Sequence, residues 1–108
     1  MMTLGSAITY TPPTVGGKTF PSVTTSSINV VCVDNPDFQN GTGNPNGRVT
    51  AILRALDASG GLHNIPKPLV LWAGAAYQSI GNWTQDQANA QVLELLGSNP
   101  AQVLEGLF

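Results

Sequence analysis

The segment SSINVVCVD, residues 26–34, constrains the fold of this chain more than any other stretch. Valine and isoleucine favour extended backbone, because a branched Cβ packs well on a pleated surface. The two-residue period of a strand places apolar side chains on both faces: Ile28, Val30 and Cys32 on one, Val31 and Val33 on the other. A strand that is apolar on both faces belongs in the middle of a sheet, so we predict a central strand here.

The segment RVTAILRAL, residues 48–56, fits two patterns. Four apolar residues follow a helical stripe (Val49, Ile52, Leu53 and Leu56), and four follow strand alternation (Val49, Ala51, Leu53 and Ala55). The loop 34–47 before it is rich in asparagine, glycine and proline, which permit tight turns. Such a loop would return the chain antiparallel beside residues 27–33, so a strand is favoured over a helix.

The loop 34–47 also resembles a binding site, because it holds Asp34 and Asp37 among asparagines and glycines. A calcium loop starting at Asp34 would place Pro36, Phe38 and Pro45 at ligand positions, and one starting at Asp37 would place Arg48 at the last. The glycines are spaced G-x-G-x-x-x-G and no lysine accompanies them, which does not fit a phosphate loop. We therefore predict a long hairpin connection without metal or cofactor, whose contacts the sequence leaves open.

The second half of the chain changes from strand to helix character. The segment PKPLVLW, residues 66–72, reads as a short strand, and AGAAYQSIG, residues 73–81, as a short helix closed by Gly81. Thr84 and Gln87 form a capping box for the next helix, which Gly97 ends. Its apolar face is Ala88, Val92, Leu95 and Leu96.

A last short helix is predicted in NPAQVLEGLF, residues 99–108, with Asn99 as its cap and Pro100 at its first position. One face is apolar: Val103, Leu104, Leu107 and Phe108. An isolated helix this short is marginal in water, so we expect it to dock on the core.

Residues 1–22 hold three prolines and the Gly16-Gly17 pair, which predict an extended arm. The arm is either a loose terminus or a strand that needs a partner surface. Because AITYT alternates like a strand, we expect intermolecular contacts by strand addition, and a fold that survives deletion of residues 1–18. The candidate contact residues are Ile8, Tyr10, Val15 and Phe20, together with Phe38 of the loop.

Charged residues make up 9% of the chain, where about a quarter is typical. So little charge favours self-association. The four cations are scattered, which argues against nucleic-acid binding. The start of the chain does not read as a signal peptide, and no window approaches 18 apolar residues, so we expect a cytoplasmic protein without a membrane span.

Catalytic chemistry has little support in the sequence. Cys32 and His63 are the only candidate nucleophile and base, and no third orienting group is apparent. The six carboxylates show no pairing pattern, and one cysteine excludes a disulfide framework. We therefore expect a protein that is not an enzyme. Three aromatic residues lie close in sequence and either line a ligand pocket or, as we favour, pack where strand meets helices: Trp72, Tyr77 and Trp83.

These patterns predict an α+β fold. It consists of an extended N-terminal arm (1–22) and a single domain (23–108), in which a small antiparallel sheet (23–72) carries two or three short helices (73–108) on one face.

The layout resembles that of small virion proteins of tailed bacteriophages. The resemblance lies in TYTPPTVGGKTFPSVTT, in the asparagine loop and in the compact helical end WTQDQANAQVLELLG. It implies a structural role in a capsid, connector or tail, with copies of the chain and other structural proteins as partners, in the host cytoplasm during assembly and then in the virion. The alternative is a small cytoplasmic adaptor or regulatory protein that binds a partner protein through its helical C-terminal part.

Overall fold

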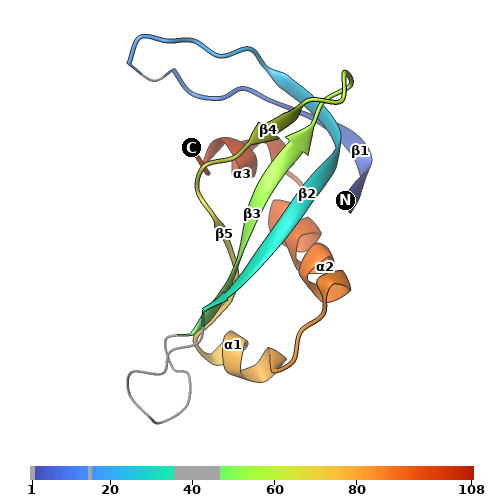
Figure 1. Cartoon of the computed structure of the whole chain (residues 1–108), viewed down its shortest axis with the longest axis vertical. Helices are drawn as coiled ribbons and strands as arrows, with labels where there is room; N and C mark the ends of the chain where they lie inside the picture. Colours follow the sequence, from blue (N-terminus) through green and yellow to red (C-terminus); the bar gives the residue numbers. More distant parts are fainter. Residues whose placement is uncertain (1, 15, 36–46) are drawn as a thin grey trace.

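A long antiparallel pair forms the centre of the sheet. In the computed structural model, which describes residues 2–14, 16–35 and 47–108, β2 (Val23–Asn35) pairs with β3 (Arg48–Leu56). The register runs without interruption from Ser27 opposite Leu56 to Asn35 opposite Arg48. Residues 48–56 are therefore a strand, as favoured from the turn-rich loop before them. Figure 1 shows the two strands running side by side along the molecule.

The other strands extend this pair on both sides. β1 (Met2–Tyr10) pairs with β2, while β4 (Leu62–Asn64) and β5 (Leu69–Ala73) pair with opposite ends of β3. All pairings are antiparallel. The predicted α+β fold with a small antiparallel sheet is confirmed, and the short strand β4 was not predicted.

The N-terminal segment differs from the predicted arm. Residues 2–10 are a strand of the chain's own sheet, and four of their side chains are buried in the core: Met2, Leu4, Ile8 and Tyr10. The register opposite β2 skips between Thr3 and Ile8, so Gly5, Ser6 and Ala7 bulge outward and stay exposed. The arm has a partner surface within the chain, and deleting residues 1–18 would take side chains from the core. Only the stretch after Tyr10 projects from the sheet (Figure 1).

Three helices follow the sheet: α1 (Ala75–Ile80), α2 (Gln85–Leu96) and α3 (Pro100–Glu105). The capping box of α2 is present, because the Thr84 hydroxyl accepts from Gln87 N–H and the Gln87 side chain accepts from Thr84 N–H. Gly97 ends α2 at a φ of 57°, a backbone region that favours glycine. Asn99 precedes α3 but its side chain makes no capping hydrogen bond, so that predicted cap is absent.

The core lies between one face of the sheet and the helices. Leu53 of β3, Val92 of α2 and Leu104 of α3 are fully buried in it. The C-terminal apolar face packs there as expected, with Val103, Leu107 and Phe108 partly buried against the cluster. The predicted face of α2 needs one correction. Leu95 is 37% exposed, because it lies at the edge of this face, 100° around the helix from Leu96, and is only partly covered.

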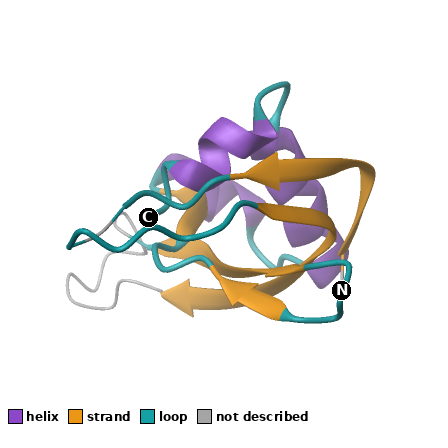
Figure 2. Cartoon of the chain, turned by 90° about the horizontal axis from the view of Figure 1, so that it is seen from above, coloured by secondary structure: helices purple, strands orange, loops and turns teal. Residues whose placement is uncertain are grey.

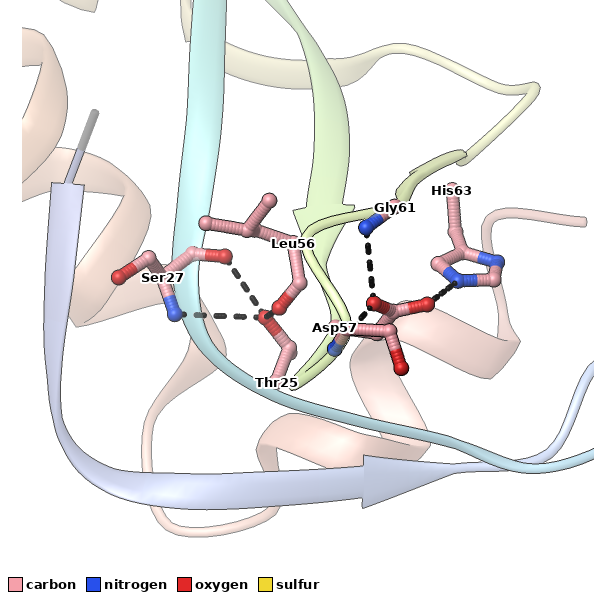
Figure 3. A network of polar contacts seen from close by, with 7 residues as sticks. Thr25, Ser27, Leu56, Asp57, Gly61 and His63 are labelled. Atoms are coloured by element: carbon pink, nitrogen blue, oxygen red, sulfur yellow. Dashed lines mark hydrogen bonds and ion pairs between the residues drawn. The ribbon is translucent and has the colours of Figure 1, made fainter.

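Two polar contacts hold the end of the central pair (Figure 3). The buried Thr25 hydroxyl lies 2.7 Å from the carbonyl oxygens of Ser27 and Leu56 and gives them a donor where β1 bulges away. Asp57 closes the turn from β3 to β4, because its Oδ1 accepts from the N–H groups of Ser59 and Gly61 at 2.8 Å. These side chains satisfy backbone groups that would otherwise lack partners at the strand ends.

We expect Leu104→Ala to lower the free energy of unfolding by about 2–5 kcal/mol, the cost of emptying a buried leucine site. Leu104 is 0% exposed, although α3 has only six residues. Leu95→Ala is the matched control, because it removes the same atoms from a partly exposed helical position. Denaturant titration measures both. Equal losses for the two variants would show that α3 is not part of the cooperative core.

Candidate interaction surface

The sheet has one face that its own helices do not cover. On β3, Val49, Ala51, Leu53 and Ala55 are fully buried, whereas Ile52, between them, is 40% exposed and points the other way. Figure 2 shows the helices gathered on one side of the strands. We call the other side of the sheet the open face. It carries the side chains of Val31, Val33, Arg48, Thr50, Ile52, Arg54 and Val70.

The open face is apolar. Directly opposite residues of an antiparallel pair share a face, so Val31 lies beside Ile52, and Val33 and Val70 lie on either side of Thr50. All four of these apolar side chains are 38–44% exposed, whereas Thr50, in their middle, is only 8% exposed because its neighbours cover it. A sheet with one face in water normally carries polar residues there. Contiguous apolar side chains on such a face mark an interaction surface.

The charge of the open face is positive. Arg48 and Arg54 are separated from Ile52 by an even number of residues on β3, so their side chains lie on the same face. Asp34 lies on the opposite face of the sheet, the one that the helices cover. Its carboxylate accepts hydrogen bonds from Tyr77 Oη at 2.6 Å and from Trp83 Nε1 at 3.0 Å. Among the described strand residues, the open face therefore presents two arginines and no carboxylate.

The aromatic cluster packs against the edge of the core. Trp72 and Trp83 lie with ring centroids 6.3 Å apart, and Trp72, Tyr77 and Trp83 are partly buried against the core. The hydrogen bond to Asp34 is the main cause that raises the pKa of Tyr77, because the neighbouring carboxylate disfavours a phenolate. The cluster joins β5, the α1–α2 connection and the end of β2, which agrees with the packing interpretation of these residues.

A groove of about 610 Å³ lies elsewhere, between the segment after β1 and strand β4. Its lining is mostly aromatic and proline side chains with a few polar ones: Tyr10, Pro12, Pro13, Phe20, Pro21, Val23, Leu62, His63, Asn64, Pro66 and Phe108. The Tyr10 hydroxyl is buried without a hydrogen-bond partner in the described part of the chain, and burial raises the pKa of Tyr10. No local sequence pattern predicts this groove, because its residues come from segments that lie far apart in the sequence.

The candidate contact residues are not brought together. Ile8 is 8% and Tyr10 1% exposed, so both side chains are occupied within the chain. Phe20 is 36% exposed, with Lys18 Nζ 5.5 Å from its ring centroid. Val15, Phe38 and most of the loop 34–47, where we expected no metal site, lie outside the described residues.

Cys32 and His63 do not form a catalytic pair. Cys32 lies opposite Ala51 and His63 opposite Ala55, so four residues of β3, about 13 Å at the strand rise, separate them. Burial raises the pKa of the Cys32 thiol, which opposes formation of the reactive thiolate. His63 Nε2 instead donates to Asp57 Oδ2 at 2.6 Å (Figure 3).

The described residues contain neither a cluster of metal-ligating side chains nor a membrane-spanning helix. In the ranges 2–14, 16–35 and 47–108, three or more His, Cys, Asp or Glu side chains nowhere gather as metal ligands would. The helices in these ranges are too short or too polar to cross a membrane.

Sequence reasoning missed the open face. Its signal was present, since Val31 and Val33 had indicated a central strand. β2 is central in its pairing, between β1 and β3, but its second face has no covering layer. Comparison with protein-family models, curated proteins and solved structures finds no match for this chain.

The contact between Asp57 and His63 predicts that the free energy of unfolding depends on pH in the acidic range. The hydrogen bond from His63 and then that from Gly61 N–H lower the pKa of Asp57 below its ordinary value. A carboxyl with a lowered pKa in the folded state stabilises the fold above its unfolded pKa, about 3.9, and loses this contribution as the pH falls through the folded pKa. The stability difference between the wild type and Asp57→Asn should therefore stay constant above about pH 5 and shrink below pH 4.

Urea titrations between pH 2 and pH 7 measure this difference. Asparagine keeps an oxygen for the two backbone donors, so the turn itself survives the substitution. His63→Ala removes the largest cause of the lowered pKa and should flatten the acid dependence. Parallel pH profiles for the wild type and Asp57→Asn would contradict the prediction.

Proposed function

We propose that this protein is a non-enzymatic structural subunit of a multi-subunit assembly and acts through protein–protein contacts. The observation that carries the proposal is the open face, where Val31, Val33, Ile52 and Val70 stand exposed together on paired strands. In a lone chain these side chains stay in water, whereas a partner surface would bury them and release about 25 cal/mol per Å² of apolar area.

The low charge of the chain supports the same proposal. With 9% charged residues, the surface has little repulsion to hold neighbouring copies apart. The virion of a tailed bacteriophage is the assembly that the resemblance of layout implies. In this reading the protein gathers in the host cytoplasm, contacts copies of itself and other structural proteins, and then remains in the particle.

We expect the purified chain to associate with rising concentration, and the double variant Val31→Thr/Ile52→Thr to weaken this association. The two residues face each other across the central pair, and threonine keeps the branched Cβ that suits a strand. Each substitution removes apolar surface worth about 0.8 kcal/mol per methylene. Together they should raise the dissociation constant about tenfold or more, measured by light scattering after size exclusion.

Phe20→Ser is the control for the projecting segment, because Phe20 is an exposed apolar side chain outside the open face. It should leave the association unchanged. If Phe20→Ser weakens association and the double variant does not, the projecting segment is the contact, as the sequence alone had suggested. A chain that stays monomeric at every concentration contradicts self-assembly and favours the adaptor alternative.

A further inference from the structure

Helix α2 presents a second exposed surface that complements the open face. Its inner side is formed by Ala88, Val92 and Leu96, all buried. Half a turn away, Asp86, Ala90 and Glu94 are exposed and follow one line along the helix, at the spacing of its turns. Leu93, which is 43% exposed, flanks this line. We call Asp86, Ala90, Leu93 and Glu94 the outer face of α2.

The two surfaces carry opposite charge. Every lysine and arginine of the chain stands at or before Lys67, whereas Asp86, Glu94 and Glu105 all follow it. The outer face of α2 therefore has two carboxylates and no cation, while the open face has Arg48 and Arg54 and no carboxylate among the described strand residues. Both surfaces also expose leucine, isoleucine or valine beside their charges.

Size permits one surface to lie on the other. Twelve residues of α2 span about 18 Å at the helical rise. Nine residues of β3 span about 30 Å at the strand rise, so the helix fits within the length of the open face. A helix laid on a sheet is also how α2 already packs inside the chain, where Gln85 and Gln91 bond to the carbonyls of Val30 and Leu71.

A contact between two open faces fits less well. Such a contact would bring Arg48 and Arg54 of both copies to one apolar interface, with no carboxylate from the described strands to meet them. Like charges placed together at an interface oppose association. Charge therefore favours a contact between the open face of one copy and the outer face of α2 of another.

We infer that the open face of one copy packs against the outer face of α2 in a second copy, head to tail, with Arg54 of the first facing Glu94 of the second. This inference rests on the proposed function and names the partner as a copy of the chain itself. Helix α2 then lies between two sheets, its own and its neighbour's. A contact between unlike surfaces repeats from copy to copy and yields a ring where the rotation closes, or a filament where it does not.

Charge reversal tests the inference. Arg54→Glu and Glu94→Arg should each raise the dissociation constant of self-association about tenfold or more, and the double variant should return it to within about threefold of the wild type. An equal mixture of the two single variants should also associate, because each then offers the surface that the other lost. Lys18→Glu alters net charge as much as Arg54→Glu does, but lies outside both surfaces and should leave association unchanged.

The outcomes separate the inference from the proposed function. A wild type that stays monomeric overturns both. A second outcome is that Val31→Thr/Ile52→Thr weakens association, Glu94→Arg does not change it, and mixing the two charge variants does not restore it. This result would overturn the head-to-tail contact but would still agree with the assembly role. If Arg54→Glu associates more tightly with the wild type while Glu94→Arg changes nothing, two open faces meet and the inference is wrong. Circular dichroism melts verify folding, and the neutral pair Arg54→Gln and Glu94→Gln replaces any variant that unfolds.

Discussion

The uninterrupted pairing of β2 with β3 is the constraint on which the rest of the structure depends. Nine consecutive residue pairs, from Ser27 with Leu56 to Asn35 with Arg48, fix which side chains face each way. A shift of one residue would exchange the faces and expose Leu53 and Val49, now fully buried. β1 attaches to the outer side of β2, and β4 and β5 to the outer side of β3, so every other strand takes its register from this pair.

Only one face of that pair receives a layer of helices. α2 contacts β2 and β5, α3 contacts β1, and both bury their apolar sides against the same face. With 108 residues and three short helices, the described chain covers one face and leaves Val31, Val33, Ile52 and Val70 on the other. The proposed assembly follows from this imbalance, because the unused apolar face and the acidic side of α2 offer surfaces that a neighbouring copy can bring together.

Polar side chains hold the ends of the layers in place. Asp34 at the end of β2 receives hydrogen bonds from Tyr77 and Trp83, so the helical side is tied to the strand that carries the open face. Asp57 closes the opposite end of β3 and holds His63. The first contact joins the sheet to the helical side, and the second joins β3 to β4.

The sequence by itself determined the local structure. The period-two pattern of residues 27–33, the capping box at Thr84 and the glycine at position 97 act over a few neighbouring residues, so β2 and α2 were predictable. Only the tertiary structure decided which surface each strand face packs against. The alternation of Ile8 and Tyr10 with threonines predicted a strand that contacts another copy, and only the pairing of β1 with β2 placed both side chains in the chain's own core. The valines of β2 indicated burial on both faces, but whether a layer exists to cover a face depends on how distant helices pack, which no short-range pattern records.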